Sequence, residues 1–465
     1  MHSKLKLMTT DLVSFFKNFK NNENYYDYLK VILLGFSFFF IIGSYSILRP
    51  LKTSVFLGLV GKEYQPLTKF ISLVILFPCL LLYAKLVDRL RRYQVVYFFF
   101  GLYFVGVILT ALFLYHPVIG LSNTSTNPYR IFGWIFYLFI DLYSPLVVST
   151  FWAFANSINS PEYAKNNYGR IVAFSRVGGI ATSLGSWFLI NHTNISYTTL
   201  IPYLLIGTSI LLIFAGLCIS RIIKKIPTKF LHGYEAAYKV EKQKVTEKTG
   251  LWEGLKLMIT KPYVFGIFGM VYSYEIISII IDYQMQVLMS IETNNAVGKM
   301  SSFMFLYTAS FQTLGLVFAL FGTSALLRWI GVHKCILIMP VATAVLMAGL
   351  LSYPSLTAIF VIMVLLRALN YGFNAPVREI LYIPTTKDIK FKSKSWIESF
   401  GRSLSKVSGS TFNLVSLAAN PIFLIRVDSA AAIAISFVWG IISLSVGKKY
   451  KKTIDSNEVI GQEKL

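Results

Sequence analysis

Charged side chains recur inside long apolar stretches of this sequence. An ionisable group in bilayer hydrocarbon costs ~2.5–3.5 kcal/mol on insertion scales, so such groups usually face a cavity or a partner and serve a function. The carboxylates of this kind are Asp141, Glu275, Asp282 and Glu398. The cations of this kind are Arg49, Lys52, Arg176, Arg367, Arg378, Arg402 and Lys406.

The spacing of these residues places several of them on common helix faces. Glu275 and Asp282 are two helical turns apart. Glu398, Arg402 and Lys406 follow one another at intervals of four residues, which also keeps them on one face. A groove with several cations and fewer carboxylates suits a multiply charged anion, because Arg offers forked donors to phosphate or carboxylate and Lys offers a compact charge.

Some of these residues also have a purely structural interpretation. Arg367 lies among Val, Leu and Ala, where it could equally be a partner for a carbonyl or a carboxylate. Glu398 and Arg402 could simply neutralise each other. Asp141 and Asp282 have no obvious partner within one helical turn, which favours a functional role for both.

Charged residues near the ends of the apolar stretches are interpreted differently. Lys62 and Lys69 are expected to be solvated. Asp88 and Arg89 open a short basic turn, and we interpret them as a conformational latch between span ends, a gating role, in preference to a substrate site.

The composition decides which elements must hold these residues. Of 465 residues, 55% are apolar and 14% are charged, and the mean hydropathy is +0.61. A soluble chain carries ~25% charge, so soluble, disordered, coiled-coil and disulfide-scaffold classes are excluded. Stretches long enough to cross ~30 Å of hydrocarbon predict an all-α polytopic membrane protein with about twelve transmembrane helices. We place these spans near 29–48, 68–87, 94–115, 131–156, 171–190, 200–220, 263–289, 302–326, 334–352, 355–375, 397–419 and 429–447.

The excess of basic residues is explained by this topology. The chain has 44 Lys and Arg against 21 Asp and Glu, a formal charge of +23. With both termini inside, 33 basic residues fall in inside segments and seven, among them Arg49 and Lys52, in outside connections. This split follows the positive-inside rule. We therefore expect a multi-pass protein of the cell (inner) membrane with both termini cytoplasmic, in contact with membrane lipid and without a nucleic-acid partner.

The span order predicts two six-helix halves. They comprise residues 1–220 and 263–465, joined by a cytoplasmic basic linker at 221–262. Arg176 in the fifth span and Arg402 in the eleventh are the last residues of similar tetrapeptides, AFSR and SFGR. Both are followed by runs of small residues. Small residues permit close helix approach, so we favour an internal duplication, with chance similarity as the alternative, and expect the halves to rock at these helices.

Enzyme and metal signatures are absent from the sequence. It contains no HExxH or GxSxG motif, and Gly298-Lys299 lacks the flanking residues of a phosphate-binding loop. Cys79, Cys218 and Cys335 occur singly in apolar runs. The N-terminus lacks the apolar core of a secretory signal. We expect a monomer that is not an enzyme and has no cofactor or metal.

Four motifs resemble the ATP/ADP translocase family of obligate intracellular bacteria and plastids. YSILRPLK at 45–52 and LVVSTFWAFANSI at 146–158 are similar to its motifs in spans one and four. REILYIP at 378–384 looks like the family's (K/R)xxxYIP. The stretch from Lys392 to Lys406 is similar to its KxKAxxDxxxxRxGKSGG. The resemblance covers residues 28 to 445, nearly the whole chain. The turn at Asp88 also resembles the span 2–3 signature of the major facilitator superfamily.

The resemblance implies a major-facilitator-type transporter that exchanges nucleotides or imports them with protons. By motif position, Lys52, Asp141, Asp282 and Lys406 fall where the family carries its functionally important Lys, Glu, Glu and Lys. The sequence departs from the family's pattern in both carboxylates and also at Thr53, Gln286 and Val407. Gln286 replaces a Lys, so strict ATP/ADP exchange is in doubt.

Three functions are compatible with these observations. In the first, Lys52, Arg49, Arg402 and Lys406 bind a nucleotide polyphosphate together with Asp141 and Asp282, which balance charge or carry a coupling proton. Coupling or gating would involve Asp88, Arg89, Glu275, Arg176, Arg378 and Glu398. The second is an enzyme or flippase that handles lipid phosphates, and the third is a transport-inactive relative.

Overall fold

The structure, a computed structural model, describes residues 23–227, 231, 251–386, 389–415, 420–456 and 458–461. Most of the predicted linker and the first residues of the chain lie outside this range. In the described part the chain is helical, apart from one isolated bridge between Thr385 and Ile460. The all-α prediction is confirmed.

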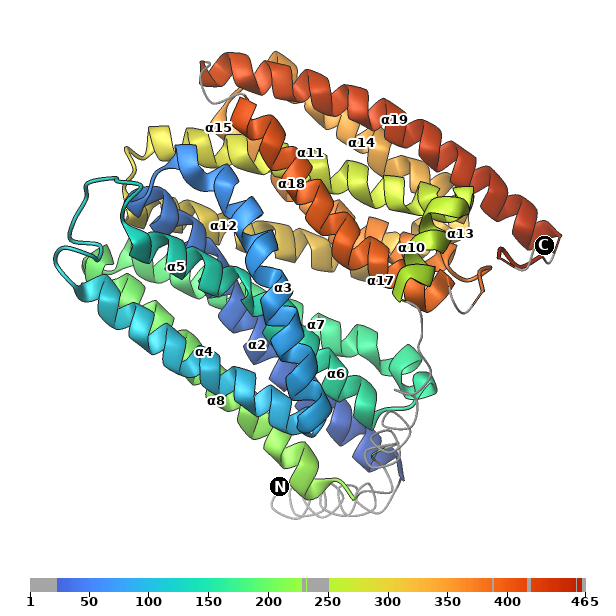
Figure 1. The fold of residues 1–465 in the computed structure, drawn as a ribbon, viewed down its shortest axis with the longest axis horizontal. Coiled ribbons are helices and arrows are strands. Elements are labelled where there is room, and N and C mark those ends of the chain that lie inside the picture. The colour runs from blue at the N-terminus through green and yellow to red at the C-terminus, as the bar shows by residue number, and fades with distance from the viewer. Residues whose placement is uncertain are drawn as a thin grey trace, which may run out of the picture.

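The helices follow one another along the chain in the order shown in Figure 1. The first group is α2 (Glu23–Leu59), α3 (Gln65–Arg89), α4 (Arg92–Tyr115), α5 (Ile131–Asp141), α6 (Ser149–Ile158), α7 (Pro161–His192) and α8 (Tyr197–Lys225). The second group is α10 (Leu251–Thr260), α11 (Pro262–Glu292), α12 (Val297–Val317), α13 (Thr323–Ile330), α14 (Val332–Ser352), α15 (Leu356–Leu369), α16 (Ala375–Leu381), α17 (Lys394–Trp396), α18 (Arg402–Val415) and α19 (Pro421–Asp455).

Ten of the predicted spans are helices long and apolar enough to cross a membrane, within the described residues. The predicted fifth span lies within α7, and the described part of the predicted eleventh span, residues 397–415, is a π-helical turn followed by α18, but neither stretch is among the apolar helices that meet that criterion. Both carry charged and small side chains in their interior, which is expected of helices that line a polar space within the bundle.

Several helices extend beyond the predicted span limits, and two of these extensions contain the buried charged residues Lys52 and Asp428. The first span does not end at residue 48, because α2 continues to Leu59 through the apolar segment that follows Lys52. Val55 and Phe56 in that extension are fully buried. The last span begins at Pro421 and not at residue 429. Lys52 therefore lies within a span, and so does Asp428.

The packing of the helices explains where the apolar residues go. In the first group α2 packs against α7 and α8, and in the second α19 packs against α11 and α14. Contacts between the groups are made by α12 with α2 and α7 and by α18 with α3. Large apolar side chains that remain exposed, such as Phe77 and Leu81 of α3 and Phe437 of α19, form the apolar surface that a lipid environment requires.

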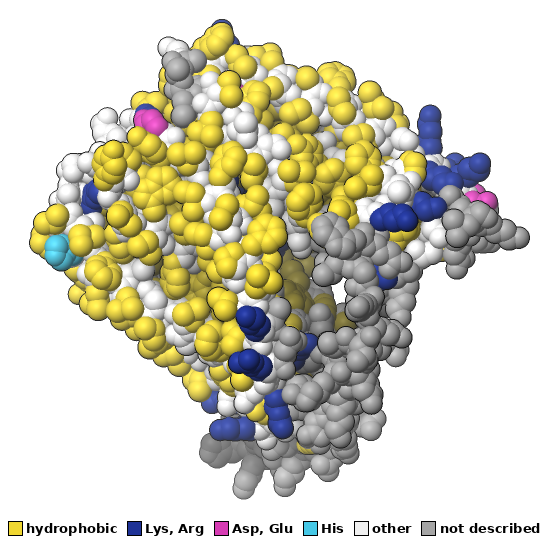
Figure 2. Space-filling view, in the orientation of Figure 1, with side chains coloured by type: hydrophobic (Ala, Val, Ile, Leu, Met, Phe, Trp, Pro, Cys, Tyr) yellow, Lys and Arg dark blue, Asp and Glu magenta, His cyan; other side chains and the backbone are white. Residues whose placement is uncertain are grey.

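The charged surface residues lie apart from this apolar surface. Figure 2 shows hydrophobic side chains over most of one face, with Lys and Arg gathered along the margin where α8 and α19 end. Such a distribution fits a membrane protein with basic residues at one end.

The two groups of helices are in contact near the loop at Lys62, which we call the Lys62 end. Ser54 of α2 and Ser301 of α12 lie within 2.6 Å of each other through their hydroxyl oxygens. The Tyr283 hydroxyl of α11 donates to the Lys62 carbonyl at 3.3 Å. The Asn191 amide of α7 donates to the Ser302 hydroxyl at 2.7 Å. Nearer the middle of the bundle, the Gln312 amide donates to the Ser46 hydroxyl at 3.0 Å.

Candidate functional site

One group of charged residues is centred on Lys52, and we call Lys52, Lys69, Tyr137 and Asp141 the lysine cluster. The Lys52 ammonium, on α2, lies 2.6 Å from the Asp141 carboxylate at the end of α5. The same ammonium lies 4.5 Å from the centre of the Tyr137 ring. Lys52 is buried, whereas the Asp141 side chain keeps 26% of its exposure. The pair is therefore sheltered but open to a ligand on one side.

Lys69 belongs to this cluster, so its predicted solvation is wrong. It lies within α3, donates to the Tyr137 hydroxyl and sits 5.2 Å from the centre of that ring. The buried Tyr137 thus contacts two ammonium groups, that of Lys52 at its ring and that of Lys69 at its hydroxyl. The sequence signal for this role is weak, because Lys69 stands at the start of an apolar run where a solvated lysine is equally common.

Lys406 completes the lysine cluster from the other group of helices. It is exposed on α18, and its positive charge acts on Asp141. Lys52 and Asp141 are in contact, and Lys406 lies near enough for its charge to act on Asp141, although these residues come from α2, α5 and α18. Their proximity depends on how the helix groups pack and cannot be derived from spacing along the chain.

A second group lies around Asp282 of α11, and we call Arg49, Asp282, Gln286, Arg367 and Tyr371 the arginine cluster. The Asp282 carboxylate is 2.9 Å from the Arg367 guanidinium of α15. Gln286, one turn further along α11, donates to the same carboxylate at 2.8 Å. Arg49 of α2 adds its charge to the surroundings of Asp282 and Arg367.

Arg367 is therefore a paired residue with a defined partner, one of the two roles considered for it. The amide of Gln286 occupies a donor position beside Asp282, where related sequences are expected to carry a Lys. Gln286 thus gives Asp282 a neutral donor at the position where the resemblance implies a positive charge.

Aromatic rings lie against the guanidinium groups of this cluster. Arg367 is 5.8 Å from the centre of the Tyr307 ring. Arg176 of α7 is 5.2 Å from the centre of the Tyr371 ring, a contact between the two helix groups. Tyr371 is 38% exposed although it lies in the interior of its span. An exposed ring beside several cations offers a surface on which a flat aromatic ligand could stack.

The remaining charged candidates form a ladder next to the arginine cluster. The Arg402 guanidinium is 2.6 Å from Glu398 and 3.6 Å from Glu275. Glu398 is in turn 4.0 Å from Arg378. The predicted pairing of Glu398 with Arg402 one turn apart is present, and Glu275 joins it from α11. Arg402 also adds its charge to the surroundings of Tyr371, which connects this ladder to the arginine cluster.

Three π-helical turns occur where these residues lie. Ser144–Val148 follows Asp141, Asn370–Asn374 contains Tyr371, and Ile397–Gly401 contains Glu398. A π-turn inserts an extra residue into a helix and rotates the residues on either side, and such turns are frequent at functional sites. Each of the three turns thus contains or adjoins a residue of the charged centre.

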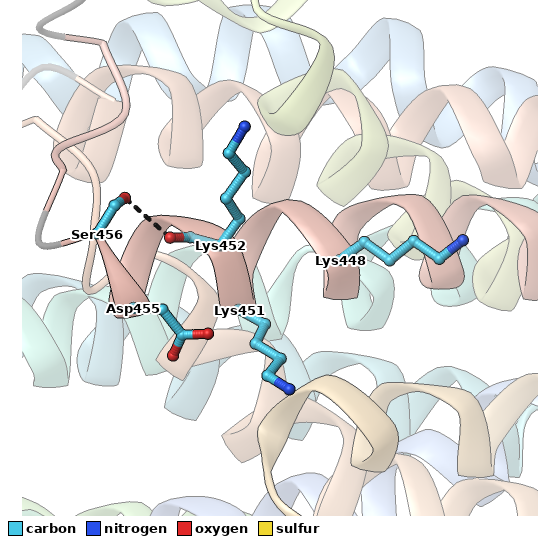
Figure 3. Close-up of a pocket in the computed structure, with 5 residues that line it drawn as sticks. All are labelled: Lys448, Lys451, Lys452, Asp455 and Ser456. Carbon is cyan, nitrogen blue, oxygen red and sulfur yellow. Dashed lines mark hydrogen bonds between the residues drawn. The ribbon is translucent and has the colours of Figure 1, made fainter.

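The predicted latch at Asp88 and Arg89 is not part of this charged centre. Arg89 is exposed at the end of α3, and the side chain of Asp88 lies outside the described residues. A separate surface hollow at the end of α19 is lined by Lys448, Lys451, Lys452, Asp455 and Ser456 (Figure 3). Its lysines point in different directions, so they do not converge on a ligand.

The composition of the charged centre limits its chemistry. Its carboxylates are Asp141, Glu275, Asp282 and Glu398, and each faces at least one cation. Lys69, Arg49, Arg176 and Lys406 are additional cations. The described residues contain no group of three His, Cys, Asp or Glu that could hold a metal. The centre therefore suits an anion with several charges.

Comparison with solved structures defines the class of protein. An inward-open structure of the xylose transporter XylE from E. coli superimposes with a TM-score of 0.60, over 93% of this chain and 97% of that one, at 13% sequence identity. This identity supports the fold alone. The protein therefore has the major-facilitator-type fold of multi-span membrane proteins.

Sequence comparison identifies the family. Residues 11–450 match the model of the TLC ATP/ADP transporter family, so the chain belongs to that family of nucleotide transporters. It is 24% identical to ADP,ATP carrier protein 1 of Rickettsia prowazekii, over 93% of this chain and 95% of that protein. It is 25% identical to the chloroplastic ADP,ATP carrier protein 2 of Arabidopsis thaliana, over 82% of this chain and 68% of that protein.

Proposed function

We propose that this protein transports a nucleotide di- or triphosphate across the cell (inner) membrane by alternating access, with ATP/ADP exchange as the leading form. The observation that carries the proposal is the pair of clusters that approach the centre from different helices, one built on Lys52 and the other on Arg367. The names of the Rickettsia and Arabidopsis relatives support a nucleotide as the ligand.

The ion pairs suggest how a polyphosphate would be bound. Without a ligand, Lys52 is neutralised by Asp141 and Arg367 by Asp282, so neither of these two buried cations is left unpaired. A phosphate chain carries more charge than one carboxylate and offers several acceptor oxygens, so it can compete for these donors. Asp141 and Asp282 would then hold the site in its empty state and be released when substrate binds.

We place the base of the nucleotide at the arginine cluster. The exposed face of Tyr371 lies beside Arg176 and within reach of the charges of Arg49 and Arg402. A base that stacks there would leave its phosphates to extend toward Lys52 and Lys406. Glu275, Glu398 and Arg378 would position Arg402 and are proposed as coupling or gating residues.

An alternative form is proton-coupled import of another nucleotide. It is favoured by Gln286, which supplies a neutral donor beside Asp282 where the sequence pattern of the ATP/ADP exchangers would supply a charge. A site with one cation fewer is expected to bind a highly charged polyphosphate less strongly.

Uptake of labelled ATP into bacterial cells that express the protein tests the proposal. A panel of unlabelled nucleotides should compete, and preloading with ADP should accelerate entry if exchange operates. Uptake that ignores internal nucleotide and collapses with a protonophore would support the proton-coupled form. Absence of saturable uptake for every nucleotide in reconstituted, folded protein would contradict nucleotide transport.

A further inference from the structure

A buried carboxyl group outside the charged centre has no counterion. Asp428 lies in α19, about two turns (~10 Å) from the start of that helix. Its side chain is fully buried, at 0% exposure. Neither of its carboxyl oxygens has a hydrogen-bond partner. The ion pairs of Asp141 and Asp282 thus have no equivalent at Asp428.

The surroundings of Asp428 are polar but uncharged. Gln284 of α11 adjoins it and is also fully buried, and both of its amide atoms lack hydrogen-bond partners. The Ser429 hydroxyl, next along α19, is buried without a partner as well. Asp428 and Gln284 adjoin each other between α19 and α11, and we call these two buried, unsatisfied side chains together with Ser429 the Asp428 pocket.

Within the part of the chain that the structure describes, no cation makes an ion pair with Asp428. On α11 the titratable residues next to Gln284 in sequence are Asp282, which is paired with Arg367, and Tyr283, whose hydroxyl donates to the Lys62 carbonyl. The exposed Glu63 lies beside Tyr283. The part of α14 from 336 to 352 contains no titratable side chain. On α19 itself Arg426 is exposed and makes no ion pair with Asp428.

An ionised carboxylate in the Asp428 pocket would strongly destabilise the fold. Burial of an isolated charge in an apolar interior costs far more than burial of a neutral hydroxyl or amide, so a group without a counterion is stable in its neutral form. A carboxylic acid can donate its proton to the Gln284 carbonyl and accept from the Gln284 amide after small side-chain rotations, whereas a carboxylate could only accept.

We propose that Asp428 is a proton-binding site of the C-terminal group of helices, protonated in the conformation seen here. When the helices separate at the nearby Lys62 end, water reaches the pocket and Asp428 releases its proton to that side, leaving a carboxylate; closure requires a proton to return. Only the second part, coupling to transport, rests on the proposed nucleotide transport, and it does so in its proton-coupled form. A proton is therefore carried apart from the substrate-binding carboxylates.

Infrared spectroscopy of the purified protein tests the protonation state directly. At neutral pH the wild-type protein should show the carbonyl band of a buried carboxylic acid, shifted by ¹³C-labelled aspartate and lost in Asp428→Asn. The control Asp455→Asn changes an exposed aspartate and should leave the band unchanged. The proposal is overturned if the labelled wild-type protein has no aspartate-derived band, a result that needs no variant. It is also overturned if the band persists in Asp428→Asn.

Proteoliposomes test the coupling. With an imposed proton gradient, wild-type protein should accumulate labelled ATP, whereas Asp428→Asn should lose the gradient-driven part and retain exchange of labelled for unlabelled ATP at equal pH. Gradient-driven accumulation by Asp428→Asn, or wild-type uptake that ignores the gradient, would overturn the coupling. If the wild-type protein moves no nucleotide, the proposed function fails, while the infrared result still decides whether Asp428 holds a proton.

Discussion

Lys52 and Asp141 show why single charged residues in this protein must be considered together with their partners. The pair is formed between α2 and α5, and it spares each side chain the cost of an isolated charge. The pair stabilises the fold only while both charges are present, because either charge alone would be sheltered from water without a counterion.

Removal of one member should therefore harm folding as well as transport. Lys52→Met leaves Asp141 without its closest cation and is expected to lower the free energy of unfolding by ~2–3 kcal/mol, less than for a fully buried pair because Asp141 is partly solvated. It should also abolish nucleotide uptake. Lys52→Met combined with Asp141→Asn should recover stability but not uptake. Thermal unfolding in detergent and uptake assays measure both, and normal uptake by the single variant would contradict the assigned role.

Lys69 provides a test of the extended lysine cluster. Lys69→Met removes a charged donor from the Tyr137 hydroxyl, and we expect the KM for nucleotide to rise by ~10-fold, which corresponds to ~1.4 kcal/mol of binding. Lys299→Met, which changes an exposed lysine outside the cluster, serves as the matched control. Equal KM values for the two variants would show that Lys69 is not part of the site.

At the scale of the helices, α7 packs closely against both α2 and α12. A Cβ atom at Gly178 would lie 2.3 Å from the carbonyl oxygen of Phe39. Because that oxygen belongs to the backbone, it cannot move aside as a side chain could. The run of small residues predicted to permit close helix approach does so at this point.

This contact predicts a clear difference between two glycines of the same helix. Gly178→Ala should force α7 away from α2 and cost about 1–3 kcal/mol of stability. Gly185→Ala meets no atom within 4 Å and should be neutral or slightly stabilising. Thermal unfolding of the two variants compares them, and equal melting temperatures would contradict the close packing.

The π-helical turns are features of the elements that the sequence pattern did not reveal. The ladder of Glu398 and Arg402 was predicted from a spacing of four residues, and the ion pair forms even though a π-turn covers Ile397–Gly401. Regular helical periodicity predicts a face, but it does not predict an inserted residue that rotates one part of the helix relative to the next.

At the scale of the whole molecule, the contacts at the Lys62 end join the two groups of helices. Alternating access requires such contacts to break when the transporter opens on that side. Ser54 and Ser301 are suited to test this, because their hydroxyl oxygens already lie within 2.6 Å.

A disulfide at this position should stop transport. In Ser54→Cys/Ser301→Cys, oxidation should crosslink α2 to α12 and abolish nucleotide uptake, and a reductant should restore it. Each single cysteine variant should be insensitive to the oxidant, which controls for Cys79, Cys218 and Cys335 of the native sequence. Undiminished uptake by protein shown to be crosslinked would mean that this end need not open.

The sequence by itself determined the membrane class, the helical fold, the family and most of the charged residues of the centre. Hydropathy and charge are properties of short stretches, so they can be evaluated without knowledge of the tertiary structure. Only the tertiary structure paired Lys52 with Asp141 and Arg367 with Asp282, brought Lys69 to Tyr137, and showed that Asp428 is buried without a counterion. These relations join residues far apart in the chain, and they depend on which faces of the helices pack together. Local sequence patterns do not encode that choice.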